Sequence, residues 1–177
     1  MNRERLAAAQ EVFAEDGPGA SLNEIARRAG VGPGTLYRHF PKRQALLTAV
    51  LRDRIQVLCE RAERLRTADS ADEALSQWLG AFLAHARANQ GMGSALMVDE
   101  PGVQDLDCHR LILDAAAGLL TRAQRQGTAR TDLTADDLVQ LVIGIALSTA
   151  RNEDAEQARR LLALVLDATH EEPRRSA

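Results

Sequence analysis

The stretch "SLNEIARRAGVGPGTLYRHFPKRQALL", residues 21–47, decides the fold of this chain. Apolar residues recur at helical spacing on both sides of a "GVGPG" break at residues 30–34. Pro and Gly are strong breakers of local structure, and Pro33 can begin a helix because the first helical position needs no N–H donor. The pattern therefore predicts two short helices, over about residues 22–29 and 34–40, joined by a tight turn.

Helices are also predicted on either side of this pair. The segment before it places Leu6, Ala9, Val12 and Phe13 on one face and ends at a Gly-Pro pair, residues 17–18. The segment after it keeps helical spacing through about residues 42–66. Ser21 and Glu24 have the spacing of a capping box at the start of the second helix.

The rest of the chain also reads as helix. Further capping boxes are predicted at Ser70 with Glu73 and at Thr134 with Asp137. The expected helices, including a short one before Pro101, run over about residues 71–88, 92–102, 105–127, 135–151 and 154–170. With no strand signal, the fold class is all-α: a three-helix helix-turn-helix domain, residues 1–46, joined by a long helix to a helical-bundle domain, residues 47–177.

Composition indicates an ordinary globular protein with an uneven charge. Hydrophobic residues make up 45% and charged residues 27%, with a net charge of -3. Residues 1–66 hold 12 Lys and Arg against 8 Asp and Glu, a net +4, whereas the rest holds 10 against 17, a net -7. The basic end hints at an anionic partner. With no membrane-length apolar run and no signal-peptide pattern, we expect a cytoplasmic protein without a membrane partner.

Catalytic motifs are missing. No G-x-S-x-G, H-E-x-x-H or Walker pattern occurs, and "GVGPG" lacks both the preceding strand and the third glycine of a dinucleotide fingerprint. The cysteines have no metal spacing and read as free packed thiols, and the histidines are scattered: Cys59, Cys108, His39, His85, His109 and His170. We therefore predict no enzyme activity, no cofactor and no metal, which disfavours a helical small-molecule enzyme.

Nucleic-acid binding fits the opening stretch better. The second helix of a helix-turn-helix presents its N-terminal residues to the major groove, and Pro33, Gly34 and Thr35 are compact enough for close approach. The Thr35 methyl can meet a thymine methyl, while Tyr37 and Arg38 can reach a phosphate or a base edge. The basic residues that follow can lie along the flanking phosphates: His39, Lys42 and Arg43. Alternatively, Tyr37 is a half-buried core residue and the basic cluster is a solvated face.

The same stretch resembles the DNA-binding domain of the TetR/AcrR family of transcriptional regulators, through its "AGV", "TLYRHF" and "ALL" segments. The match covers about residues 1–50. The resemblance implies that Ser21 caps a helix and touches phosphate, and that Asn23 lies where a base or backbone contact is often made. The family's usual Ser-Lys-Glu is replaced by Lys42, Arg43 and Gln44, which leaves open whether Lys42 or Arg43 makes the main phosphate contact.

The C-terminal helices predict a partner. "LVQLVIGIALSTA", residues 138–150, is apolar on nearly all faces, so it is either a central core helix or part of a subunit interface. We prefer a homodimer through about residues 134–170, since twofold homodimers are the commonest soluble oligomers.

The resemblance further implies a repressor that an unknown small-molecule effector releases from a palindromic double-stranded DNA operator. The alternative is a helical protein-interaction module that retains the motif without a specific operator. Six side chains could line the effector pocket, although each is equally well explained as an ordinary core residue: Trp78, Phe82, Met92, Met97, His109 and Ile112.

Overall fold

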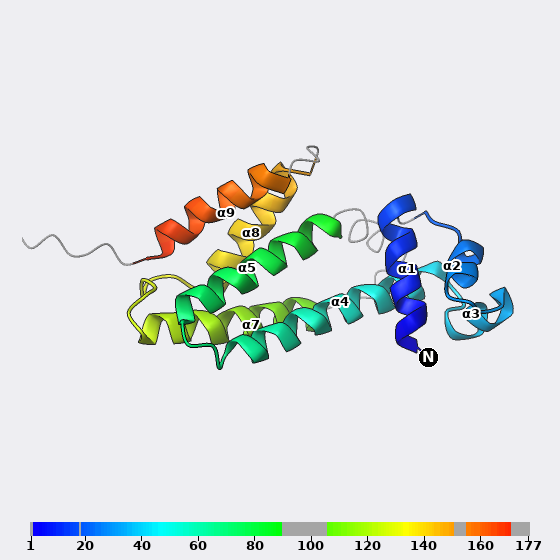
Figure 1. Cartoon of the computed structure of the whole chain (residues 1–177), viewed down its shortest axis with the longest axis horizontal. Helices are drawn as coiled ribbons and strands as arrows, with labels where there is room; N and C mark the ends of the chain where they lie inside the picture. The colour runs from blue at the N-terminus through cyan, green and yellow to red at the C-terminus, as the bar shows by residue number, and fades with distance from the viewer. Residues whose placement is uncertain (1, 18, 90–105, 151–154, 171–177) are drawn as a thin grey trace, which may run out of the picture. The chain divides into compact units, whose positions relative to one another are not determined.

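The computed structural model describes residues 2–17, 19–89, 106–150 and 155–170, and the regular secondary structure of these residues is entirely helix (Figure 1). The prediction of an all-α protein is confirmed. The helices are α1 (Asn2–Asp16), α2 (Leu22–Arg28), α3 (Pro33–His39), α4 (Arg43–Leu65), α5 (Ala71–Ala88), α7 (Leu106–Arg125), α8 (Ala135–Ser148) and α9 (Ala155–Thr169). The short helix expected over residues 92–102 lies outside the described residues. None of the described helices has both the length and the apolar character that crossing a membrane requires.

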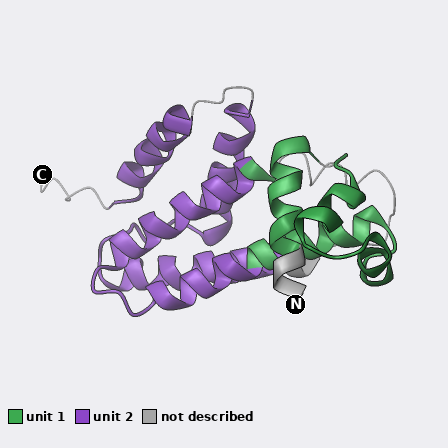
Figure 2. Cartoon of the chain, turned by 45° about the vertical axis from the view of Figure 1, so that its right-hand side comes forward, with its two compact units in different colours: residues 1–55, 88–105 green, residues 56–87, 106–177 purple. Residues whose placement is uncertain are grey.

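The chain divides into two compact units (Figure 2). Unit 1 comprises residues 1–55 and 88–105, and unit 2 comprises residues 56–87 and 106–177. Helix α4 crosses the boundary between residues 55 and 56, so its first half belongs to unit 1 and its second half to unit 2.

Unit 1 is built on one apolar core. Helix α2 packs against both α1 and α3. Each of the helices that the structure describes in this unit contributes to the core, which includes Val12, Phe13, Ile25, Leu36, Phe40, Leu46, Leu47 and Val50. Gly17 ends α1 with a φ of +75° and donates from its backbone N–H to the carbonyl of Phe13, as its place in the sequence predicts.

Unit 2 has a separate core centred on Trp78, which is fully buried. The Trp78 Nε1 donates a 3.0 Å hydrogen bond to the carbonyl oxygen of Leu58, which joins α5 to α4. The Arg122 guanidinium of α7 donates to the carbonyl oxygens of Leu65 and Ala68, and so holds the connection that follows α4. Helix α8 packs against both α7 and α9.

The predicted caps have three different outcomes. At α8 the capping box is confirmed, because Asp137 N donates to Thr134 Oγ1 and Thr134 N donates to the Asp137 carboxylate. At α5 only half of the box forms, since Glu73 N donates to the Ser70 hydroxyl while the Glu73 carboxylate accepts from Gln77. At α2 the box is absent and the prediction of its hydrogen bonds is wrong, although Ser21 does occupy the N-cap position.

Candidate nucleic-acid interface

A Schellman motif makes the turn between α2 and α3. Val31 N donates to the Ala26 carbonyl at 3.0 Å, and Gly30 N donates to the Arg27 carbonyl at 3.2 Å. Gly30 has a φ of +63°, a left-handed conformation that a residue with a Cβ adopts only at a cost. The first glycine of the "GVGPG" break is therefore needed for its backbone conformation, because it turns the chain sharply into α3.

Helix α3 begins with little side-chain bulk. Gly32 is its N-cap and Pro33 occupies the first turn, as predicted. Thr35 N and Leu36 N both donate to the Gly32 carbonyl, at 2.9 and 3.2 Å. Because the backbone of this turn is satisfied and its side chains are small, the start of α3 can come close to another molecule.

Burial on one side of α3 determines which side chains face outward. Leu36 is fully buried and Phe40 is 8% exposed, both within the core of unit 1. Tyr37, between them, is 44% exposed, and it is a surface residue rather than part of the core. Tyr37 is therefore about half buried, as one alternative expected, but it does not belong to the apolar core.

All ten residues expected to contact DNA belong to unit 1, and they lie at its surface. Thr35 is partly buried and the others are exposed: Ser21, Asn23, Pro33, Gly34, Tyr37, Arg38, His39, Lys42 and Arg43. They come from the start of α2, from α3 and its flank, and from the start of α4. Which of them touch DNA stays a prediction.

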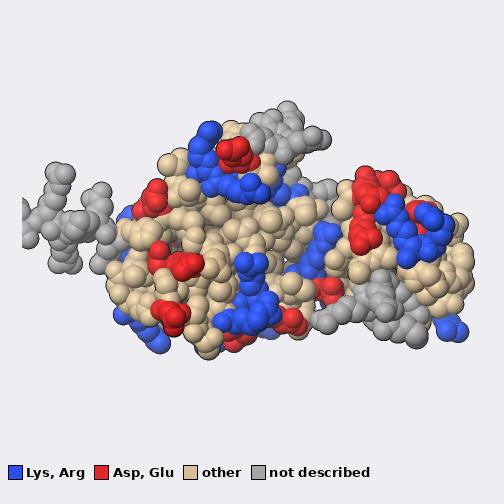
Figure 3. All heavy atoms as spheres, in the orientation of Figure 1, with Lys and Arg blue, Asp and Glu red and all other residues tan. Residues whose placement is uncertain are grey.

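Two arginines of α2 are held in ion pairs. Arg27 donates to both Glu24 oxygens at 2.8 and 2.6 Å. Arg28 donates to Glu24 at 3.1 Å and, through two nitrogens, to Glu15 of α1 at 2.9 and 2.5 Å. The hydrogen bonds from Arg27 and then Arg28 lower the pKa of Glu24 to about 2. On the face of unit 1 in Figure 3, acidic and basic side chains accordingly lie together.

These pairs account for one half of the missing capping box and separate two groups of cations. The Glu24 carboxylate accepts hydrogen bonds from two guanidinium groups and not from the backbone N–H of Ser21. By contrast, neither Arg38 nor Arg43 forms a hydrogen bond or ion pair with the part of the chain that the structure describes. Their guanidinium groups are therefore available for a partner.

Unit 1 contains a polar network that the sequence pattern did not predict. Arg54 of α4 donates to the side chain of Asn89, which follows α5, and to the Gln10 carbonyl of α1 at 3.5 Å. The Gln10 amide donates to Asp53 at 3.0 Å. Asn89 is only 8% exposed. No periodicity reports these contacts, because the partners are 35 to 44 residues apart in the chain.

The expected effector-pocket residues are only partly brought together. Trp78 and Phe82 stack in the core of unit 2 with ring centroids 5.6 Å apart, and Ile112 packs against the same core. His109 is exposed on α7. Met92 and Met97 lie outside the described residues. No group of three His, Cys, Asp or Glu side chains suited to a metal occurs in residues that the structure describes.

Comparison with known families agrees with this geometry. A model described as "Bacterial regulatory proteins, tetR family" matches residues 6–50. A second, described as "Transcriptional regulator SbtR-like, C-terminal domain", matches residues 70–168.

Individual relatives are also described as transcriptional regulators. A TetR transcriptional regulator from Streptomyces coelicolor is 39% identical, with a TM-score of 0.84 over 96% of this chain and 98% of that chain. The HTH-type transcriptional regulator UidR of Escherichia coli is 25% identical over 161 residues, 88% of this chain and 82% of UidR.

A more distant structure shares the fold. The transcriptional regulator FadR from Bacillus subtilis, solved in complex with stearoyl-CoA, is 20% identical with a TM-score of 0.66, over 97% of this chain and 98% of that chain. With a family model at each end and a close structural relative over nearly the whole length, the chain belongs to the TetR family of transcriptional regulators, with its DNA-binding domain at the N-terminus.

Proposed function

We propose that this regulator is a homodimeric repressor that binds a near-palindromic operator and leaves it when a small-molecule effector binds. The observation that carries the proposal is the compact, exposed start of α3, followed by two arginines without a partner in the described chain.

In the proposed complex, α3 enters the major groove. Pro33 and Gly34 let the backbone approach the base edges, and the Thr35 methyl contacts a thymine methyl. Tyr37 and Arg38 bind a phosphate or a base edge. Lys42 and Arg43 bind the flanking phosphates at the start of α4, where the free N–H groups of a helix N-terminus also favour an anion.

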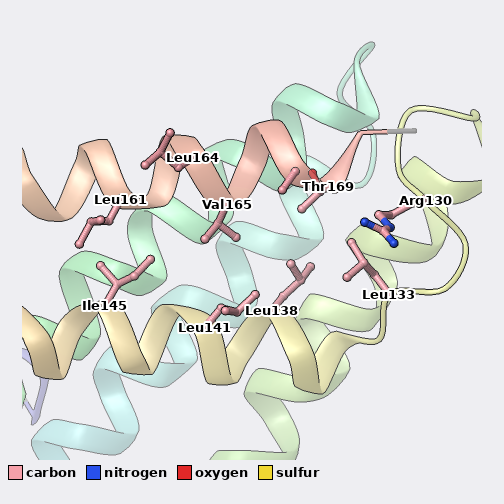
Figure 4. A pocket seen from close by; sticks show the side chains of 10 residues that line it. Arg130, Leu133, Leu138, Leu141, Ile145, Leu161, Leu164, Val165 and Thr169 are labelled. Atoms are coloured by element: carbon pink, nitrogen blue, oxygen red, sulfur yellow. The ribbon is translucent and has the colours of Figure 1, made fainter. Parts of the chain in front are cut away.

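An apolar surface of unit 2 supports the dimer. Leu141 and Leu147 of α8 are 46% and 63% exposed, and Leu164 of α9 is 60% exposed. A hollow of about 400 Å³ lies between these helices, and Figure 4 shows Leu161 and Val165 of α9 on the side that faces α8. Exposed apolar groups of this kind mark an interaction surface, and a second copy that covered them would pair two recognition helices.

The effector response follows from linkage. An effector can release DNA only if it binds the non-operator conformation more tightly. Helix α4 belongs to both units, and Arg54 ties it to α1 and to the residue after α5. We propose that α4 transmits the effect of a ligand bound in unit 2, in the region of Trp78, Phe82 and Ile112.

Selection of bound fragments from genomic DNA tests the proposal. The wild-type chain should enrich one inverted repeat, and Tyr37→Ala should bind that repeat more weakly, while Val57→Ala, an exposed change in unit 2, should bind like wild type. A promoter reporter carrying the repeat should be less active when the protein is present. A selection that enriches no sequence would contradict the proposal.

A further inference from the structure

A basic hollow in unit 2 is separate from the proposed recognition surface and from the proposed dimer surface. It has a volume of about 440 Å³, within the range of small-molecule sites. Two segments line it. One is Arg66, the residue that follows α4, and the other is the C-terminal part of α7, with Ala117, Gly118, Thr121, Arg122 and Arg125. The proposed recognition surface is in unit 1, and the proposed dimer surface is on α8 and α9.

The small residues of α7 make the room. Ala117, Gly118 and Thr121 lie on one face at helical spacing, and a Cβ added at Gly118 would meet no heavy atom within 4 Å. The hollow therefore results from missing side-chain volume between three arginines.

The three guanidinium groups differ in how far they are already engaged. Arg122 is held by the carbonyls of Leu65 and Ala68, which use two of its five N–H donors. Arg66 pairs with Glu63 at 3.2 Å, but both side chains are exposed, by 58% and 70%, so water weakens this pair. Arg125 has no hydrogen bond or ion pair with any described residue.

The charge of the lining is poorly compensated. Three guanidinium groups line the hollow, and Glu63 beside Arg66 reduces their charge of +3 to +2. The sequence has no Asp or Glu between residues 115 and 125 of α7. A phosphoryl group carries between about -1.5 and -2 charge at neutral pH, and its three oxygens accept the paired donors that guanidinium groups offer.

We propose that this hollow binds the phosphate group of a small phosphorylated molecule. Arg122, oriented by its two carbonyl contacts, fixes the position of the anion. Arg66 and Arg125 close on it from either side, and the Thr121 hydroxyl can donate a further hydrogen bond.

Calorimetric titration of the full chain with inorganic pyrophosphate, at constant ionic strength, tests the proposal. Wild type should bind saturably. Arg66→Gln and Arg125→Gln should each weaken binding about tenfold, the effect of losing one charge-assisted hydrogen bond. Arg61→Gln removes an exposed arginine of α4 outside the hollow and should bind as wild type does.

Three results would overturn the proposal. One is the absence of saturable binding by wild type. Another is an equal loss in Arg61→Gln, which would indicate that binding depends on the general charge of the surface and not on the hollow. The third, in a parallel titration with citrate, is binding of this carboxylate ligand but not of pyrophosphate.

Discussion

The Trp78 indole nitrogen and the Leu58 carbonyl oxygen are 3.0 Å apart inside the core of unit 2, where the hydrogen bond between them joins α5 to α4. Trp78→Phe removes this bond and leaves part of the indole volume empty. The Leu58 carbonyl lies in the middle of α4 and can still accept a backbone hydrogen bond within that helix. The expected loss of unfolding free energy is therefore moderate, about 2 kcal/mol. Urea denaturation measures it. Val57→Ala, at a 49% exposed position of the same helix, should change stability by less than about 0.5 kcal/mol.

Gly30 permits a second prediction about stability. Gly30→Ala forces a Cβ into a left-handed backbone with a φ of +63° and should cost about 1–2 kcal/mol. Gly19→Ala is the matched control, because Gly19 has open space for a Cβ and no left-handed φ. Denaturation of both variants should therefore show a loss for Gly30→Ala alone. Equal stability of the two variants would contradict the role assigned to Gly30.

The helices could be predicted from sequence because their signals are local. Apolar spacing and the Gly-Pro and Gly-x-Gly-Pro breaks placed α1 to α4 to within one or two residues. The capping boxes show where local reasoning ends. Thr134 and Asp137 have no competing arginine in their first turn and form the box, whereas Glu24 is followed by Arg27 and Arg28 and binds them instead.

The features that could not be predicted from the sequence depend on long-range contacts. Exposure of the start of α3 could be predicted, because Leu36 and Phe40 determine which face is buried. The contact of Arg54 with Asn89, and the hollow between Arg66 and Arg125, join residues that are 35 or more positions apart. Periodicity within one helix contains no information about such partners.

The salt dependence of operator binding is a third prediction. If Arg43 binds one phosphate, Arg43→Gln should reduce the slope of log affinity against log salt concentration by about one. Fluorescence anisotropy at several salt concentrations measures this slope. Lys42→Gln measured alongside would show which of the two residues makes the main phosphate contact, and Arg61→Gln is the control. Unchanged slopes for both Lys42→Gln and Arg43→Gln would exclude the proposed phosphate contacts.

The pair between His170 and Asp72 predicts a pH dependence of stability. Asp72 Oδ1 lies 3.0 Å from His170 Nε2, and its hydrogen bond is the main cause that raises the pKa of His170 above 6.5. Because the pKa of His170 is higher in the folded than in the unfolded state, the pair stabilises the fold fully at pH values below the unfolded-state pKa. This stabilisation is lost as pH rises through the folded-state pKa. The stability advantage of wild type over His170→Ala should therefore shrink as pH rises from about 6.5, the ordinary pKa of histidine, through the raised pKa of the folded state. Denaturation at a series of pH values checks this, and an advantage that grows with pH would contradict it.

The exposed leucines of α8 and α9 predict the dimer surface. Leu164→Glu places a charge on a side chain that is 60% exposed in the single chain, so it should not unfold the protein. In a dimer the same charge would be buried without a partner, and the variant should be a monomer by light scattering. Val57→Glu, at a 49% exposed apolar position of α4, should remain a dimer. Operator affinity should fall with Leu164→Glu alone, because a monomer cannot hold both half-sites at once. A Leu164→Glu variant that remains a dimer would place the interface elsewhere.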